Sequence, residues 1–244
     1  MRGDKILVQE EHRRAAAAVT QILLPSLMKT DGRFAVSIGG ESGSGKSELA
    51  VALTEALGQH EIGSIIIQQD DYFVYPPRTN DAKRREDINH VGLAEVRLDL
   101  LDDHVQSILN GAKTIEKPLV VYHGDRITQE TLPLDGVDVV IVEGTYTTLL
   151  ENVHSRVFID RTYEQTSSAR LKRDREPLDP FLEQALEIEH GIISNHKRFA
   201  DIIVTQLFEV VTQAPRGRIE DIPIKCGSNH KEVITEESSH RAGF

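Results

Sequence analysis

Short apolar runs recur along the chain and are separated by segments with helical spacing. The runs occupy residues 34–38, 64–68, 137–144, 156–160 and 200–204. Continuous apolar runs of this length, rich in β-branched residues, are typical of parallel strands buried on both faces. Strands that alternate with helices predict an α/β fold, a doubly wound and mostly parallel sheet in a three-layer α/β/α arrangement.

The segments around these runs predict further elements. Residues 9–29 have a helical pattern, which Pro25 is expected to kink or interrupt. Residues 114–123 predict a short extended pair or edge strand, and residues 74–90 a long polar loop that can include a helical turn. Other helices are expected at 46–57, 168–175 and near 181–196, with a packing helix whose apolar stripe is Ala94, Leu98, Leu101, Val105 and Ile108.

Composition narrows the class of protein. The chain has 244 residues, with 28 Lys and Arg against 39 Asp and Glu, so its net charge is −11. This charge argues against a general nucleic-acid or anionic-membrane surface, because both need a cationic face. The single Cys226 excludes an internal disulfide and a cysteine metal cluster. No apolar run approaches a membrane span or the core of a signal peptide, so we expect a cytoplasmic protein.

A glycine-rich loop follows the first strand and precedes a helix. It reads Gly40-Glu41-Ser42-Gly43-Ser44-Gly45-Lys46-Ser47. Glycines let such a loop point successive backbone N–H groups at one anion, and the helix N-terminus adds its positive dipole end. The pattern predicts a nucleoside triphosphate site in which Lys46 reaches the β- and γ-phosphates and Ser47 gives a hydroxyl to Mg²⁺. The nucleotide-binding residues are Gly40, Ser42, Gly43, Ser44, Gly45, Lys46 and Ser47.

Acidic residues follow two other strands. Ligands of open parallel sheets bind at the carboxyl ends of the strands, so Asp70, Asp71 and Glu143 should converge on the phosphate loop. Glu143 is expected to bind Mg²⁺ directly or through water, although a strand-end acid can also cap a neighbouring helix. One aspartate of the Asp70-Asp71 pair is expected to act as the base, and the residues alone do not choose between them.

Basic residues and histidines offer further candidates. Arg170 and Arg173 can close over transferred phosphate, or they can be part of a solvated helix face. Lys83-Arg84-Arg85 is expected to be solvated, on a loop that would cover the substrate. His90 and His123 are candidates for substrate contact, and neither has metal-ligand spacing.

Several motifs together resemble the uridine kinase and phosphoribulokinase-like P-loop kinases over about residues 33–204. Besides the glycine-rich loop they are Gln69-Asp70-Asp71-Tyr72-Phe73, Val142-Glu143-Gly144, Arg170-x-x-Arg173-Asp174 and Phe199-Ala200-Asp201-Ile202-Ile203. The first of these also looks like nicotinamide riboside kinase. The resemblance implies the P-loop fold, ATP and Mg²⁺ as cofactors, Asp70 as the catalytic base, and Arg170 and Arg173 in a lid over ATP.

The resemblance also implies where the acceptor binds. Asn89-His90 falls where uridine kinases carry an Asp-His-Pro segment that binds ribose, so the chain has Asn89 in place of that acid. Tyr122-His123-Gly124-Asp125-Arg126 stands where those enzymes have Tyr-Asp-x-x-x-His against the pyrimidine. The candidate substrate-binding residues are Asp71, Tyr72, Phe73, Asn89, His90, Tyr122, His123 and Arg126.

The expected function is transfer of the γ-phosphoryl group of ATP to a hydroxyl of a small metabolite. A nucleoside is the best-supported acceptor, and a sugar, a polyol or a hydroxy-acid are alternatives. A nucleotide-hydrolysing switch and a kinase-like binding protein without catalysis are rivals of other classes. We expect an N-terminal helix in 1–30, a kinase domain in 31–210 with a lid near 163–180, and a tail in 211–244. The sequence predicts no nucleic-acid or membrane partner and allows a homo-oligomer.

Overall fold

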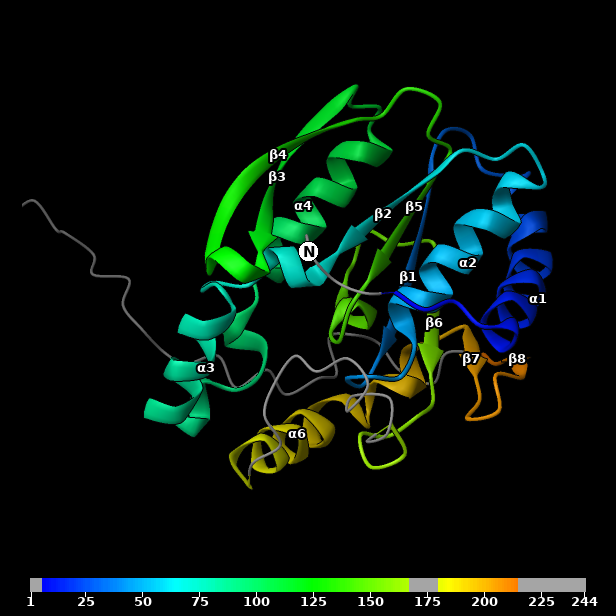
Figure 1. The fold of residues 1–244 in the computed structure, drawn as a ribbon. Helices are drawn as coiled ribbons and strands as arrows, with labels where there is room; N and C mark the ends of the chain where they lie inside the picture. Colours follow the sequence, from blue (N-terminus) through cyan, green and yellow to red (C-terminus); the bar gives the residue numbers. More distant parts are fainter. Residues whose placement is uncertain (1–5, 167–179, 215–244) are drawn as a thin grey trace, which may run out of the picture.

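The computed structural model describes residues 6–166 and 180–214, and its centre is a six-stranded sheet (Figure 1). The strand order is β2-β5-β1-β6-β7-β8. All neighbouring strands are parallel except β7 and β8, which are antiparallel. The strands are β1 Phe34–Gly40, β2 Ser64–Gln68, β5 Val139–Glu143, β6 Ser155–Ile159, β7 Ile202–Val204 and β8 Val210–Thr212. The predicted doubly wound parallel sheet is therefore confirmed.

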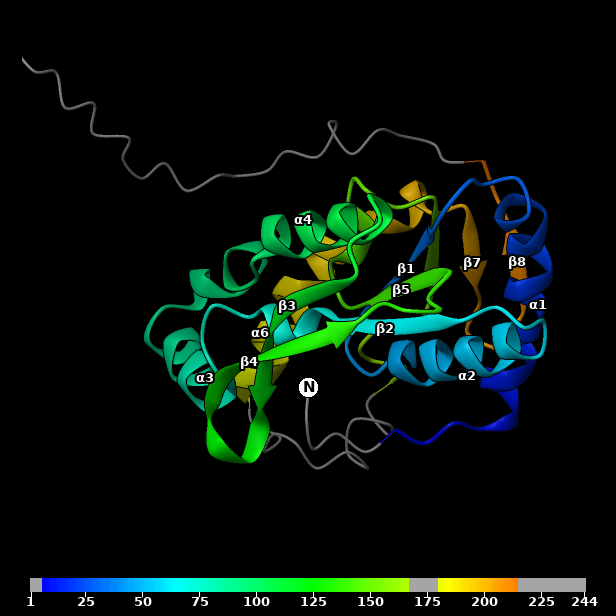
Figure 2. The same cartoon turned by 90° about the horizontal axis from the view of Figure 1, so that it is seen from above.

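Helices cover both faces of the sheet. On one face lie α1 Glu10–Leu27 and α2 Lys46–Gly58, and on the other lie α4 Leu98–Leu109 and α6 Pro180–Ile193 (Figure 2). The two faces have separate apolar cores, because alternate residues of a strand point to opposite sides. Val36 and Ile38 of β1 pack under α1 and α2, whereas Ala35 belongs to the core beneath α4.

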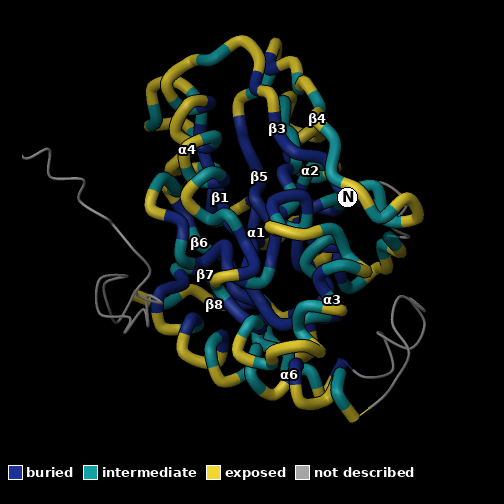
Figure 3. Tube along the Cα trace, turned by 90° about the vertical axis from the view of Figure 1, so that its left-hand side faces the viewer, coloured by how far each residue is buried: buried dark blue, intermediate teal, exposed yellow. Residues whose placement is uncertain are grey.

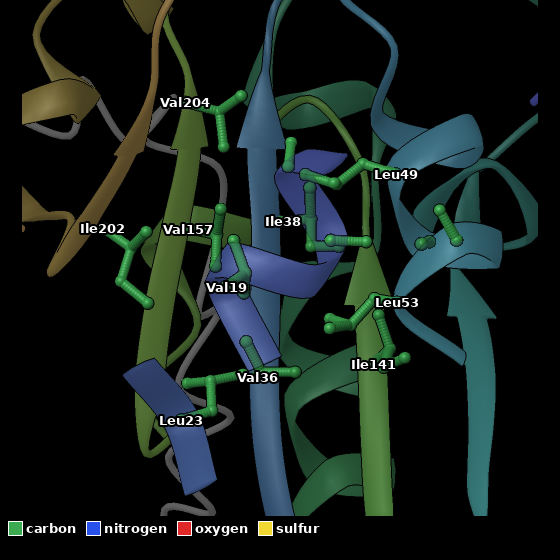
Figure 4. Packing of buried hydrophobic residues seen from close by; sticks show 14 of the residues in the cluster. Val19, Leu23, Val36, Ile38, Leu49, Leu53, Ile141, Val157, Ile202 and Val204 are labelled. Atoms are coloured by element: carbon green, nitrogen blue, oxygen red, sulfur yellow. The ribbon is translucent and has the colours of Figure 1, made fainter. Parts of the chain in front are cut away.

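The core under α1 and α2 is seen from close by in Figure 4. Val19 of α1 and Leu49 and Leu53 of α2 lie over Val36 and Ile38 of the sheet. The sheet is almost wholly buried along the middle of the molecule, whereas the outer surfaces of the helices are exposed (Figure 3). Because both faces are covered, the strands of the sheet interior read as continuous apolar runs in the sequence.

Two predictions about individual elements were wrong. Helix α1 continues through Pro25 to Leu27, so the proline does not interrupt it, and of the two predicted effects only a kink stays a prediction. Pro25 lies in the last turn, so few helical residues follow the hydrogen bond that it removes, and the apolar face of the helix is packed on the core. Residues 74–90 are not a long loop, because they contain helix α3 Pro77–Glu86.

Contacts from a distant hairpin explain α3. Strands β3 Thr114–Val121 and β4 Arg126–Pro133 form a separate antiparallel pair. At its turn, the Asp125 carboxylate accepts hydrogen bonds from Arg78 N at 2.7 Å and from Thr79 Oγ1 at 3.0 Å. Pro77 at the first helical position and this external cap satisfy the N-terminus of α3.

Short 3₁₀ turns connect these elements. They are η1 Gln69–Tyr72, η2 Ile88–His90, η3 Leu93–Glu95, η4 Tyr122–Gly124, η5 Thr147–Leu149 and η6 His196–Phe199. None of the helices in the described residues is long and apolar enough to cross a bilayer. The expected tail begins too early, because residues 211 and 212 belong to β8. Residues 215–244 and most of the expected lid, with the basic segment 168–175, lie outside the described residues.

Candidate active site

The phosphate loop leaves β1 and enters α2 at the carboxyl edge of the sheet. Gly43 has φ +76° and Gly45 has φ +104°, backbone conformations that L side chains rarely adopt. Gly45 is the N-cap of α2, so the first free N–H groups of that helix lie in the loop. Lys46 Nζ donates to the Glu41 carbonyl oxygen at 2.8 Å, which places the ammonium group over the loop.

Neighbouring segments hold the outside of this loop. Thr166 Oγ1 donates to the Ser42 carbonyl oxygen at 2.9 Å, and the Arg161 guanidinium donates to the Ser44 carbonyl oxygen at 3.3 Å. These contacts come from the segment that follows β6. The loop is thus fixed by its surroundings in a shape that suits an anion at its N–H groups.

Glu143 lies beside the loop at the end of β5. Its Oε1 accepts hydrogen bonds from Ser47 Oγ at 2.9 Å and from Gln68 Nε2 at 3.0 Å, and the residue is buried. Burial raises the pKa of Glu143, and the nearby charge of Asp70 raises it further, whereas Lys46, Gln68 and Ser47 oppose the shift. Because the charge of Asp70 acts on Glu143, the two acids lie near each other, as the sequence predicted.

This corner of the site fits a divalent cation. The Glu143 carboxylate and the Ser47 hydroxyl provide oxygen donors, and the mutual repulsion of Glu143 and Asp70 is what a cation would relieve. Among the described residues, no group of three or more His, Cys, Asp and Glu side chains is arranged to hold a metal without other ligands. A cation here would therefore take its remaining ligands from bound phosphates, as Mg²⁺ commonly does.

The structure separates Asp70 from Asp71. Asp71 is 2% exposed, and its carboxylate accepts from Lys117 Nζ at 2.6 Å and from Val120 N at 3.0 Å. This ion pair fastens η1 to β3, so Asp71 is not placed for the predicted contact with an acceptor. Asp71 and Lys117 line a cavity of about 360 Å³ beside Ser47, whereas Asp70 lines a different one, which includes Ser42 of the phosphate loop.

That cavity has a volume of about 160 Å³ and lies between the loop, η1, α3, the β3–β4 hairpin and α6. Its lining contains three aromatic side chains and several charged ones. The lining residues are Ser42, Asp70, Phe73, Tyr75, Pro77, Asn80, Asp81, Arg84, Val120, Tyr122, Thr145, Leu182, Leu186 and Glu189. Phe73 and Tyr122 were predicted acceptor contacts, and the structure brings them together here with Asp70.

Tyr72 lies elsewhere than its prediction implied. Its side chain is fully buried in the core beneath α4, and its hydroxyl lies 2.8 Å from His104 Nδ1. Burial raises the pKa of Tyr72 well above its ordinary value, and the charge of Asp71 adds to the shift. The aromatic residue after the aspartates therefore packs under the site and does not line the cavity.

Several other predicted contacts are outside the cavity lining. Asn89, His123 and Arg126 are exposed, and Asn89 donates from N and Nδ2 to Asp87 Oδ1. His90 Nε2 lies 3.2 Å from Oδ1 of the cavity residue Asn80, and its ring centroid lies 5.8 Å from that of the cavity residue Tyr75, so His90 supports the cavity lining without being part of it. The predicted lid arginines, Arg170 and Arg173, lie outside the described residues.

The sequence missed a buried ion cluster behind the cavity. Arg84 donates to Glu95 Oε2 at 2.6 Å, to Glu95 Oε1 at 3.0 Å and to Glu189 Oε1 at 2.9 Å. Glu95 is fully buried and also accepts from Gly92 N and from the amide of Asn80. The expectation that Lys83-Arg84-Arg85 is solvated was therefore wrong for Arg84, whose side chain is 14% exposed.

A helical reading of residues 77–86 would have supplied the missing signal. Pro77, Asn80, Asp81 and Arg84 are three or four positions apart, so they share one face of α3, and all four line the cavity. Lys83 and Arg85 lie on the outer side, where their side chains are 43% and 40% exposed. For these two residues the exposure agrees with the prediction that the basic segment is solvated.

A comparison with protein-family models matches residues 35–178 to the phosphoribulokinase / uridine kinase family. The chain belongs to this family. The matched segment contains the phosphate loop, η1, the hairpin and Glu143. Members of the family are P-loop kinases that transfer phosphate from ATP to an alcohol, and this chain is an ATP-dependent small-molecule kinase of the same kind.

Individual relatives agree with the family. A uridine kinase from Bacillus mycoides is 27% identical over 191 residues, which cover 73% of this chain and 88% of the relative. A uridine kinase from Bacillus cytotoxicus is 28% identical over the same length and coverage.

Solved structures share the fold at lower identity. The structure of a possible uridine kinase from Bacillus stearothermophilus has a TM-score of 0.57 at 21% identity and covers 79% of this chain and 98% of its own. Phosphoribulokinase from Rhodobacter spheroides has a TM-score of 0.58 at 10% identity, with 77% of this chain and 82% of its own covered. These likenesses establish the P-loop kinase fold.

Proposed function

We propose that the acceptor of this kinase is a nucleoside, and that its hydroxyl group takes the γ-phosphoryl group of ATP beside Asp70. The observation that carries the proposal is one cavity that joins Ser42 of the phosphate loop to Asp70 and then to an aromatic and polar chamber. A phosphoryl donor at the loop and an acceptor in the chamber would meet at Asp70, as transfer between them requires.

Each polar residue of the site has a distinct role in this proposal. The amides of residues 40–47 and the Lys46 ammonium hold the β- and γ-phosphates. Asp70 takes the proton of the acceptor hydroxyl. At the same time the hydroxyl oxygen bonds to the γ-phosphorus, and the bond between that phosphorus and the β-γ bridging oxygen breaks. Ser47 and Glu143 would hold Mg²⁺, which supplies neutralisation of phosphate charge. Gln68 orients Glu143 through its hydrogen bond to Oε1.

The walls of the chamber suit a base attached to a sugar. Phe73, Tyr75 and Tyr122 offer flat aromatic surfaces, and Leu182 and Leu186 add an apolar floor. Such surfaces bind planar rings by stacking and burial. Asn80, Asp81 and Thr145 place amide, carboxylate and hydroxyl groups in the same lining, where they can pair with sugar hydroxyls. The curated relatives named uridine kinase support the same class of acceptor.

The charge of the chamber argues against an anionic acceptor. Asp70, Asp81 and Glu189 line it, and the one cation of the described lining is Arg84. Both Glu95 and Glu189 already accept hydrogen bonds from the Arg84 guanidinium, so its charge is compensated within the protein. A carboxylate or a phosphate on the acceptor would face net negative charge, which is unfavourable at short range in a partly buried site.

The test is an acceptor screen with purified protein and Mg-ATP, in which ADP release is measured. Uridine, cytidine and purine nucleosides are compared with uncharged sugars and polyols, and with glycerate and sugar phosphates. We expect acceptor-dependent ADP release with at least one nucleoside and none with the anionic compounds. Activity only with anionic acceptors would refute the proposal, and ADP release without any acceptor would favour a nucleotide-hydrolysing switch.

A further inference from the structure

The second residue of the phosphate loop is an acid, although the loop binds a polyanion. The Glu41 side chain is 7% exposed, and Glu41 belongs to the loop whose N–H groups would bind the phosphates. An ionised carboxylate at this position repels a triphosphate unless its charge is compensated. The groups that surround Glu41 therefore matter for nucleotide binding.

Two segments far from the loop in sequence bind this carboxylate. Oε2 accepts a hydrogen bond from Tyr163 N at 2.6 Å, and Oε1 lies 2.7 Å from Nδ1 of His190 in α6. A carboxylate only accepts hydrogen bonds, so the geometry requires a proton on His190 Nδ1. The His190 ring is further held by the Tyr163 ring, whose centroid is 5.7 Å away.

We propose that His190 is a positioning residue of the nucleotide site, which acts by compensating the charge of Glu41 and by holding its carboxylate against α6, away from the phosphates. The pair Glu41–His190 thereby lets a loop with an internal acid accept a triphosphate. Charge-assisted hydrogen bonds of this length are strong ones. The proposal rests on the phosphate loop and is independent of the identity of the acceptor.

The same contact joins the two substrate regions. His190 follows Glu189 in α6, and Glu189 lines the chamber and accepts from Arg84. A displacement of His190 from Glu41 would therefore also loosen the chamber wall. For this reason the decisive measurement uses nucleotide alone, without an acceptor, so that failure of the nucleoside proposal does not affect it.

The experiment compares nucleotide affinities of variants by isothermal titration calorimetry with ATP, ADP and AMP, with Mg²⁺ present throughout. In His190→Ala the Glu41 carboxylate keeps the hydrogen bond from Tyr163 N but loses its side-chain donor, and we expect the affinity for ATP to fall about tenfold. The loss should be smaller for ADP and smallest for AMP, because it follows the charge near the loop. His60→Ala, an exposed histidine beyond the end of α2, is the matched control and should bind all three like the wild type.

Rescue separates charge compensation from a merely structural role. In Glu41→Gln/His190→Ala the acid is absent, and we expect ATP affinity to return to within about threefold of the wild type, because the introduced amide oxygen still accepts from Tyr163 N. Equal losses for the three nucleotides in His190→Ala, no loss, or no rescue would each overturn the proposal.

A further variant keeps the proposal testable if His190→Ala does not fold. Glu41→Gln alone should bind ATP at least as tightly as the wild type, because it removes a negative charge from the loop. Its amide oxygen can accept from Tyr163 N, and its NH2 group can donate to His190 Nδ1 when the imidazole carries its proton on Nε2. A tenfold weaker affinity in this variant would contradict the proposal. Thermal unfolding of each variant without nucleotide reports whether the fold is intact.

Discussion

Asp70 and Asp71 are adjacent in the chain but face different parts of the molecule. Asp70 lines the cavity that joins the phosphate loop to the acceptor chamber, whereas Asp71 is buried in an ion pair with Lys117. The 3₁₀ geometry of η1 turns consecutive side chains to different sides, so one carboxylate can serve chemistry and the next can serve the fold. Their substitutions should therefore have different consequences.

Exchange of each aspartate for asparagine tests this division. Asp70→Asn should lower kcat by about 10²- to 10⁴-fold with little change in ATP affinity or thermal stability, because it removes the proposed base. Asp71→Asn should unfold at lower denaturant concentration, with a loss of about 2 kcal/mol, because the buried Lys117 loses its nearest counter-charge and keeps Glu130, which is 31% exposed and 3.3 Å away. Steady-state kinetics and urea unfolding of both variants are the measurements, and near-normal turnover in Asp70→Asn would show that the base assignment is wrong.

The raised pKa of Glu143 gives a second prediction at the residue scale. Since the folded state holds this proton more tightly than the unfolded chain does, stability without ligands falls as the pH rises through the native pKa of the carboxyl. Glu143→Gln lacks this ionisation, while its amide oxygen can still accept from Ser47 and Gln68. Without metal or nucleotide, its Tm at pH 7.5 should exceed that of the wild type by about 2–4 °C, equivalent to about 1 kcal/mol.

The same difference should disappear in acid. Below the ordinary glutamate pKa of 4.5 the wild-type carboxyl is also protonated, so the two proteins should melt together. Melting curves by circular dichroism between pH 4 and pH 8 provide the test. If Glu143→Gln is instead less stable than the wild type at pH 7.5, burial of the ionised carboxylate is not a cost to the fold.

At the scale of elements, helix α3 is held by partners that are distant in sequence. Asp125 of the hairpin caps its start, and Arg84 near its end is bound to Glu95 of η3 and Glu189 of α6. These contacts make α3 a wall of the chamber, between the hairpin and α6. Its own sequence is strongly polar, so the helix depends on these contacts more than on an apolar face.

Removal of Arg84 should show this dependence. Arg84→Ala leaves the fully buried Glu95 without its guanidinium partner, and we expect a loss of about 3–5 kcal/mol in the free energy of unfolding. Arg85→Ala, one position along and 40% exposed, is the control and should change stability by about 1 kcal/mol or less, since it loses an exposed ion pair with Asp81 and a contact over the Phe181 ring. The measurement is urea unfolding followed by circular dichroism.

A paired substitution distinguishes lost charge compensation from lost packing. In Arg84→Met/Glu95→Gln the fully buried charge of Glu95 is removed together with its partner, and a long apolar side chain fills the space, while Glu189, which is 12% exposed, keeps its charge. We expect this protein to recover most of the stability that Arg84→Ala loses. An equally unstable double variant would mean that packing of the guanidinium, and not its charge, holds α3 in place.

For the whole molecule, the sequence predicted the parts that depend on local chemistry. The strands were recognisable because both faces of the sheet are covered, which makes their residues continuously apolar, and the phosphate loop was recognisable from its glycines. Helix α3 and the role of Arg84 were not, because Asp125, Glu95 and Glu189 act across the fold. The burial of Tyr72 was missed for the same reason: its environment is made by α4.

The position of the phosphate loop in the sheet leads to a prediction about thermal stability with nucleotide bound. The loop follows β1, which lies between β5 and β6 in the apolar core, so nucleotide at the loop contacts the centre of the fold. Binding of Mg-ATP to the folded state alone should raise stability by about 2.7 kcal/mol at a concentration of about 100 Kd, which corresponds to a Tm increase of about 5–10 °C.

Lys46 decides whether this increase reports the phosphate loop. Lys46→Met keeps the apolar stem and removes the ammonium group, which in the structure donates to the Glu41 carbonyl oxygen. The variant should melt within about 4 °C of the wild type without ligand, because it loses the bond to the Glu41 carbonyl oxygen and the attraction of Lys46 to Glu143. It should show almost no increase with Mg-ATP, because the triphosphate loses its cation. Lys29→Met, an exposed lysine after α1, should keep the full increase. A full increase in Lys46→Met as well would place the nucleotide outside the loop between β1 and α2.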